Sequence, residues 1–171
     1  MARQQLSSLW LDYGEPGLKE KFLLNLSAAT TAGKFLWTTS DEMRSIECLA
    51  PLGDGYSLHR QYVLDAVISA LPGAKSGDEA DVESLDAAQG RLWICGSHSL
   101  TRRNSSKSDS DGVDPRIRKR PSRRLLAALP LSKDGDAVSA GEALPFRGTG
   151  SLRAVLGGSE HIAPFMELLF G

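Results

Sequence analysis

The apolar residues of this chain fall in short runs, most of them broken by Gly, Pro, Asn or Asp. Residues 35–39 read Phe-Leu-Trp-Thr-Thr between a glycine and a polar triplet, which is the length and setting of a strand. Residues 46–52 and 56–64 flank Gly-Asp-Gly, a strong turn signal, and together predict a hairpin. The pattern therefore favours β-structure in this part of the chain.

The same pattern continues beyond this hairpin, with one ambiguous segment. Further strands are predicted in four places: before a turn at 14–17, at 81–85, at 91–96 and at 123–131. Residues 63–71 fit either a strand or two helical turns, so one short helix is the alternative there. Residues 133–150 are Gly- and Asp-rich and indicate a loop, and 151–158 indicate a weaker element.

Two hairpins in the sequence have a similar design. Residues 26–37 and 82–93 each run through a glycine turn to an apolar strand that begins with or contains Leu-Trp, and polar clusters follow at 40–42 and 97–99. Repetition of small antiparallel sheets is typical of radial β architectures. The predicted fold is all-β: a partial β-propeller of antiparallel blades with long loops, forming a single domain over residues 1–171.

Composition and charge narrow the function classes. The chain has 171 residues, 41% hydrophobic and 24% charged, and its net charge of -1 gives no general attraction to nucleic acid or an acidic membrane. No run approaches a membrane span, and the N-terminus lacks the apolar run of a signal peptide. Cys48 and Cys95 lie among apolar neighbours without metal-site spacing. Reduced thiols and a cytoplasmic location are expected, with a disulfide as the alternative.

An acidic element carries the first candidate chemistry. Glu79, Asp81 and Glu83 occupy every second position, which on a strand places three carboxylates on one face. Such a group requires a cation or an arginine, and calcium, with further oxygens from Asp41 and Glu42, is one candidate. The alternative is a solvated loop whose carboxylates point to water.

A histidine between two serines forms the second candidate, in the sequence Gly-Ser-His-Ser. Adjacent side chains on a strand point to opposite faces, so Ser97 and His98 are not expected to form a nucleophile and its base. The nucleophile-elbow pattern also lacks its second glycine. Either His98 is a hydrogen-bonded structural residue, or it binds an anion together with Arg102 and Arg103.

Residues 105–122 differ from their surroundings, because they are rich in Ser, Asp, Lys and Arg and hold few large apolar side chains. We interpret them as a polar and basic loop inserted between strands. The wider basic tract, residues 102–124, could contact RNA or phosphate groups, but it lacks the interleaved aromatic residues on which bases stack. A solvated loop is therefore favoured over a nucleic-acid partner.

These motifs resemble a known bacterial family, the domain of unknown function 3616 family. The resemblance rests on five segments: residues 40–42, 79–85, 92–103, 124–131 and 161–165. It implies a propeller-like fold, similar in style to calcium-dependent phytase-like and esterase-like propellers. Ser84 stands where the family pattern has glycine. Family members continue past the segment similar to 161–165, so a C-terminally truncated member is expected, less stable than a full-length relative.

Three functions remain as hypotheses. The first is a binding scaffold for a small anionic ligand, with the acidic element and the Gly-Ser-His-Ser strand end at one mouth of the propeller. The second is a calcium-assisted hydrolase of phosphate or carboxyl esters, and the third is a nucleic-acid contact through residues 105–122. The candidate catalytic residues are Asp81, Glu83 and His98, the candidate metal ligands are Glu79, Asp81 and Glu83, and the candidate binding residues are Asp41, Glu42, Ser97, His98, Arg102 and Arg103.

Overall fold

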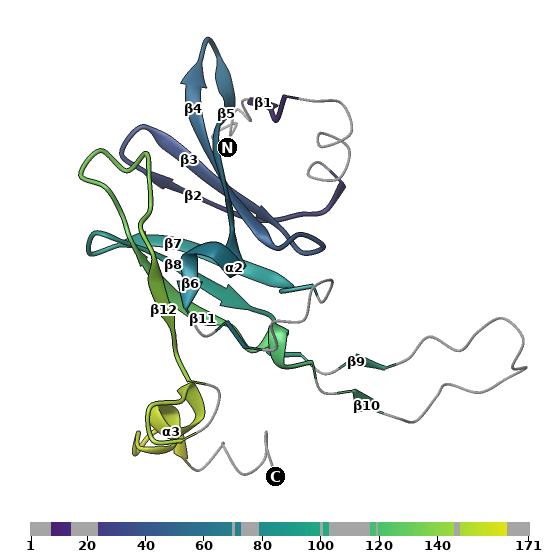
Figure 1. The fold of residues 1–171 in the computed structure, drawn as a ribbon, viewed down its shortest axis with the longest axis vertical. Helices are drawn as coiled ribbons and strands as arrows, with labels where there is room; N and C mark the ends of the chain where they lie inside the picture. Colours follow the sequence, from purple (N-terminus) through teal and green to yellow (C-terminus); the bar gives the residue numbers. More distant parts are fainter. Residues whose placement is uncertain are drawn as a thin grey trace, which may run out of the picture.

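The fold is strand-rich, and its strands form two curled five-stranded sheets (Figure 1). The computed structural model describes residues 8–14, 24–69, 71–72, 79–99, 101–102, 117–118, 120–145 and 148–163. In both sheets four strands form an antiparallel meander, and a fifth strand joins its outer edge in parallel. This arrangement is that of an all-β partial propeller, as the sequence predicts.

The first sheet, sheet A, has the strand order β1-β5-β4-β3-β2. Its strands are β1 (Trp10–Asp12), β2 (Leu26–Ala32), β3 (Phe35–Ser40), β4 (Ser45–Leu52) and β5 (Gly55–Val63). The predictions for residues 35–39, 46–52 and 56–64 are confirmed to within a residue or so at each end. These strands form because their apolar residues can be buried on the sheet while the intervening glycine turns reverse the chain.

The second sheet, sheet B, has the order β6-β12-β11-β8-β7. Its strands are β6 (Ile68–Ser69), β7 (Val82–Ala88), β8 (Arg91–Gly96), β11 (Leu126–Pro130) and β12 (Gly141–Ala143). Residues 63–71 satisfy both alternatives, because the helix α2 (Leu64–Val67) leads directly into β6. The loop prediction for residues 133–150 is wrong at β12, a strand of only three residues that the Gly-rich composition conceals.

Shorter elements complete the described part of the chain. They are β9 (Thr101–Arg102), which pairs antiparallel with β10 (Ile117–Arg118), the 3-10 turn η1 (Pro121–Arg123) and the helix α3 (Leu152–Gly157). Helix α3 begins where Ser151 Oγ accepts a hydrogen bond of 3.2 Å from the Ala154 amide. Among the described residues, no helix is long and apolar enough to cross a membrane.

The two sheets repeat one design, which confirms the similarity of the two hairpins. A β-bulge interrupts the pairing of β2 with β3 between Leu26 and Ala28, and another interrupts β7 and β8 between Val82 and Ser84. Ser84 is therefore the first residue paired after a bulge.

The core lies between the two sheets. Apolar side chains of β3 and β4 pack in one cluster with those of β8 and β11; its largest members are Trp37, Ile46, Leu92, Ile94 and Leu129. The strands β2 and β7 lie side by side, and the Ser27 hydroxyl of β2 donates to the Val82 carbonyl of β7 over 2.6 Å (Figure 1). A meander of one sheet thus stacks on the face of the next.

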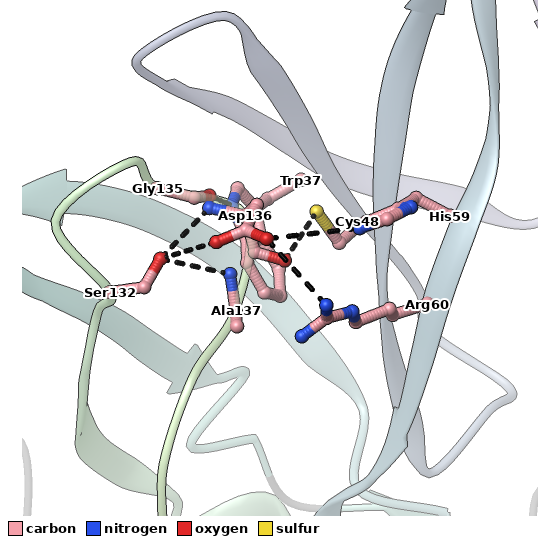
Figure 2. A network of polar contacts seen from close by, with 8 residues as sticks. All are labelled: Trp37, Cys48, His59, Arg60, Ser132, Gly135, Asp136 and Ala137. Atoms are coloured by element: carbon pink, nitrogen blue, oxygen red, sulfur yellow. Dashed lines mark hydrogen bonds and ion pairs between the residues drawn. The ribbon is translucent and has the colours of Figure 1, made fainter.

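The loop between β11 and β12 fastens sheet B to sheet A. Figure 2 shows this loop meeting the side chains of β3, β4 and β5. The Trp37 indole donates to the Gly135 carbonyl over 2.9 Å, and the Cys48 thiol donates to the Asp136 carbonyl over 3.3 Å. Gly135 has a φ of 78°, and a Cβ there would lie 2.5 Å from the Ala32 carbonyl oxygen, so only glycine fits this close approach.

Candidate functional site

The predicted acidic element and the Gly-Ser-His-Ser strand end come together at one edge of sheet B, around Arg123. β8 ends at Gly96, and the chain after it runs beside the residues that precede β7 and β11. The Ser97 amide donates to the Asp81 carbonyl and the His98 amide to the Arg123 carbonyl, each over 2.9 Å. Backbone hydrogen bonds therefore fix three separate segments of the chain against one another.

The Arg123 guanidinium makes three side-chain contacts. Its Nη1 lies 2.6 Å from Asp81 Oδ2 and donates to Ser99 Oγ over 2.9 Å. Its Nη2 lies 3.5 Å from Glu79 Oε2. The Arg123 and Asp81 side chains are only 17% and 12% exposed, whereas that of Glu79 is 45% exposed. Arg123 thus holds the Asp81 carboxylate firmly and the Glu79 carboxylate loosely.

Backbone strain is concentrated at this site. Among the described residues, three other than glycine have a positive φ, and two of them are Asp81 at 50° and His98 at 53°; the third, Gln89, lies in the β7–β8 turn. A residue held in this region costs on the order of 1–3 kcal/mol. Because the surrounding hydrogen bonds hold two such residues in adjoining segments, the strain marks a candidate functional site.

Gly96 is required where the segments meet. A Cβ at this position would lie 2.5 Å from the Arg123 carbonyl oxygen and 3.3 Å from that of Ala80. Any side chain there would push the Arg123 backbone away from the strand end. The glycine of the Gly-Ser-His-Ser sequence therefore serves the close approach that brings Arg123 to the serines.

The serines and the histidine are engaged separately. Ser97 Oγ and Ser99 Oγ are 2.9 Å apart and share a hydrogen bond, and the Ser99 amide donates to Ser97 Oγ over 3.3 Å. His98 Nε2 lies 3.2 Å from the Leu125 carbonyl oxygen and donates to it, because a carbonyl oxygen can only accept. These contacts agree with the expectation that Ser97 and His98 do not act as a nucleophile and its base.

Arg123 is the central residue that the sequence analysis did not single out. In the sequence it is one of several cations in the tract 102–124, and the predicted anion contacts are Arg102 and Arg103. The available signal was the acidic element itself, whose like charges require a cation or an arginine. Arg102 lies in β9, and Arg103 lies outside the described residues, as do residues 105–116 of the predicted basic loop.

The three carboxylates of the acidic element do not share a strand face. β7 begins only at Val82, Asp81 has a positive φ, and the bulge at Val82 breaks the alternation that the prediction assumed. Glu79 and Asp81 face Arg123, while Glu83 is exposed on β7. In the described ranges, no group of three or more His, Cys, Asp or Glu side chains is placed to hold a metal ion. Calcium binding stays a prediction.

Asp41 and Glu42 take the place in sheet A that Ser97 and His98 take in sheet B. The Asp41 amide donates to the Asn25 carbonyl over 3.1 Å, as the Ser97 amide does to its partner. In sheet A a short turn follows, with the Met43 amide donating to the Ser40 carbonyl. In sheet B a long stretch of chain follows instead, and after it Arg123 lies against the strand end. Among the described residues, the candidate site therefore lies in one of the two copies of this backbone frame.

A second polar network surrounds Asp136 (Figure 2). Its carboxylate accepts from Ser132 Oγ over 2.7 Å and lies 3.6 Å from Arg60 Nη2 and 3.9 Å from His59 Nε2. The hydrogen bond from Ser132, aided by Arg60, lowers the pKa of the Asp136 carboxyl. Burial raises the pKa of the Cys48 thiol to about 12, so this cysteine is not an activated nucleophile. The network fastens the loop and offers no reactive group.

Comparison with known proteins places the chain in a family. No curated protein and no solved structure matches it. One family model, described as Protein of unknown function (DUF3616), matches residues 25–168. The match covers both sheets from β2 onward and every residue of the Arg123 site. The chain therefore belongs to the DUF3616 family of proteins of unknown function.

Proposed function

We propose that this protein is a binding scaffold and that the Arg123 site holds a small anionic ligand. The observation that carries the proposal is that the two terminal nitrogens of the Arg123 guanidinium are bonded unequally. Nη1 is fixed by Asp81 and Ser99, while Nη2 has, among the described residues, only the 3.5 Å contact with the half-exposed Glu79. A positioned guanidinium with one weakly used nitrogen is preorganised for an incoming carboxylate or phosphate oxygen.

The partial burial of Arg123 supports an anion, since its side chain is only 17% exposed. A partly buried guanidinium interacts with an anion more strongly than one in open solvent, because less water screens the charges.

Binding is favoured over hydrolysis by the hydrogen bonds of the Gly-Ser-His-Ser segment. The two serine hydroxyls bond to each other, and His98 bonds to a backbone carbonyl. Neither serine has a base within hydrogen-bond reach among the described residues. A cytoplasmic location is part of the proposal, because the free thiols of Cys48 and Cys95 suit a reducing compartment.

Isothermal titration calorimetry of the chain with acetate, glycolate and inorganic phosphate tests the proposal. Arg123→Lys retains the charge but loses the planar geometry, and we expect it to weaken binding of the bound anion by about tenfold. The matched control is Arg91→Lys, because Arg91 is exposed at the opposite end of β8 from Gly96. Equal affinities of the two variants would contradict a site at Arg123.

A further inference from the structure

We infer that the ligand of the Arg123 site is a small carboxylate, which takes the place that the Glu79 carboxylate now occupies. The inference rests on the proposed function and adds the chemical class of the ligand. Glu79 is an internal occupant of the position opposite Nη2, and its chemistry indicates what the position accepts.

The contact between Glu79 and Arg123 is weak enough to be exchanged. Its N···O distance of 3.5 Å compares with 2.6 Å for Asp81, and the Glu79 side chain is 45% exposed against 12% for Asp81. Exposed ion pairs contribute little, because water solvates the separated charges nearly as well. Glu79 can therefore turn to solvent at small cost, whereas Asp81 stays in place and holds the guanidinium.

The vacated position suits another carboxylate. Arg123 would offer Nη2 to one oxygen of the ligand, in the plane in which guanidinium and carboxylate groups pair best. The ligand would replace one singly charged carboxylate with another, so the local charge stays unchanged. A phosphate dianion would instead bring additional negative charge next to Asp81, which is fixed 2.6 Å from Nη1. The position therefore favours a carboxylate over a phosphate.

The serine pair supplies a second donor. Ser99 Oγ accepts from Arg123 Nη1, and Ser97 Oγ accepts from the Ser99 amide. Either hydroxyl can donate to the other, and in both arrangements one hydroxyl hydrogen of the pair is left for a ligand oxygen. A carboxylate that carries a neighbouring oxygen, such as a 2-hydroxy acid, can use this donor, whereas acetate cannot.

Two neutral variants separate this mechanism from general charge effects. Glu79→Gln removes the competing charge, and we expect glycolate to bind about fivefold more tightly than to the wild-type chain. Glu83→Gln makes the same chemical change at an exposed position of β7 and should leave the affinity unchanged. Replacement of both serines, Ser97→Ala with Ser99→Ala, should make the affinities for glycolate and acetate equal. Calorimetric titration of each variant with acetate, glycolate and inorganic phosphate measures these differences.

The outcomes separate this inference from the proposed function. Binding of phosphate without binding of either carboxylate overturns the inference and leaves an anion site at Arg123. Equal glycolate affinities of the Glu79→Gln and Glu83→Gln variants also overturn it, because Glu79 would then not occupy the ligand position. If neither the wild-type chain nor Glu79→Gln binds any of the three anions, the proposed function fails as well.

Discussion

At the scale of single residues, Glu47 is the most unusual side chain of sheet A. It is fully buried on β4, where Ser45 donates to Oε1 over 2.6 Å and Gln61 donates over 3.3 Å. Its second oxygen, Oε2, is buried without a hydrogen-bond partner among the described residues. Burial raises the pKa of Glu47 from 4.5 to about 7, and the two hydrogen bonds offset only part of this shift.

The raised pKa predicts that stability falls as the pH rises. Because the folded state binds the Glu47 proton more tightly than the unfolded chain, the contribution is fully present below about pH 4.5 and is lost by about pH 7. Its size is on the order of 3 kcal/mol. Glu47→Gln should remove this dependence and be more stable than wild type at pH 8, measured by urea denaturation across the pH range. The exposed Glu83→Gln should follow the wild-type curve, and a Glu47→Gln curve that also does so would contradict the assignment.

Gly96→Ala tests the close approach of Arg123 to the strand end. The added Cβ would meet the Arg123 carbonyl oxygen at 2.5 Å, so the backbone must shift. Overpacking of this kind costs about 1–3 kcal/mol, and it should also weaken anion binding because the guanidinium moves with its backbone. Gly157→Ala is the control, since a Cβ there meets nothing within 4 Å and Gly157 ends a helix. Equal stability of both variants in urea would count against the tight packing.

At the scale of elements, the loop between β11 and β12 holds the two sheets together through one serine. Ser132 Oγ donates to Asp136 Oδ1 and accepts from the backbone amides of Asp136 and Ala137. These three hydrogen bonds fold the loop so that Asp136 can reach Cys48 and Arg60 on sheet A. The β11–β12 loop, which the sequence predicts to be a simple connection, therefore also joins sheet B to sheet A.

Ser132→Ala should loosen this loop. Loss of the hydroxyl leaves polar groups unsatisfied and costs about 1–3 kcal/mol in urea denaturation. It should also speed the reaction of Cys48 with a thiol reagent, because the loop covers a thiol whose pKa burial now holds at about 12. Ser139→Ala, at an exposed position of the same connection, is the control. An unchanged rate of Cys48 modification would contradict the proposed fastening.

Elements with a strong local pattern could be predicted from the sequence, and elements made by tertiary contact could not. The strands β3, β4 and β8 are compact apolar runs between turns, and β5 is an alternating segment after a Gly-Asp-Gly turn, so their positions follow from the pattern. β12 is visible only through its pairing with β11. Likewise, the acidic element and the Gly-Ser-His-Ser sequence indicated a site. Arg123 lies far along the sequence from both, and no local pattern indicates that it returns to them.

At the scale of the whole molecule, the two sheets are stacked so that sheet B covers one face of sheet A. The face of sheet A that carries Trp37, Ile46 and Cys48 is covered by sheet B, and all three are fully buried. The matching face of sheet B carries Trp93, which is paired with Ala128 as Trp37 is paired with Cys48. Trp93 is 37% exposed. Equivalent residues of one repeated design thus have different surroundings, since in the described part of the chain only the first sheet is covered on this face.

This difference predicts unequal effects of the same substitution at the two tryptophans. Trp37→Phe loses the 2.9 Å hydrogen bond to Gly135, part of the stacking on Tyr62 and the volume of a buried ring, so it should cost about 2–3 kcal/mol. Trp93→Phe removes a partly exposed ring without such a bond and should cost less than about 1 kcal/mol. Urea denaturation followed by circular dichroism measures both. A Trp93→Phe cost equal to that of Trp37→Phe would contradict this difference in surroundings.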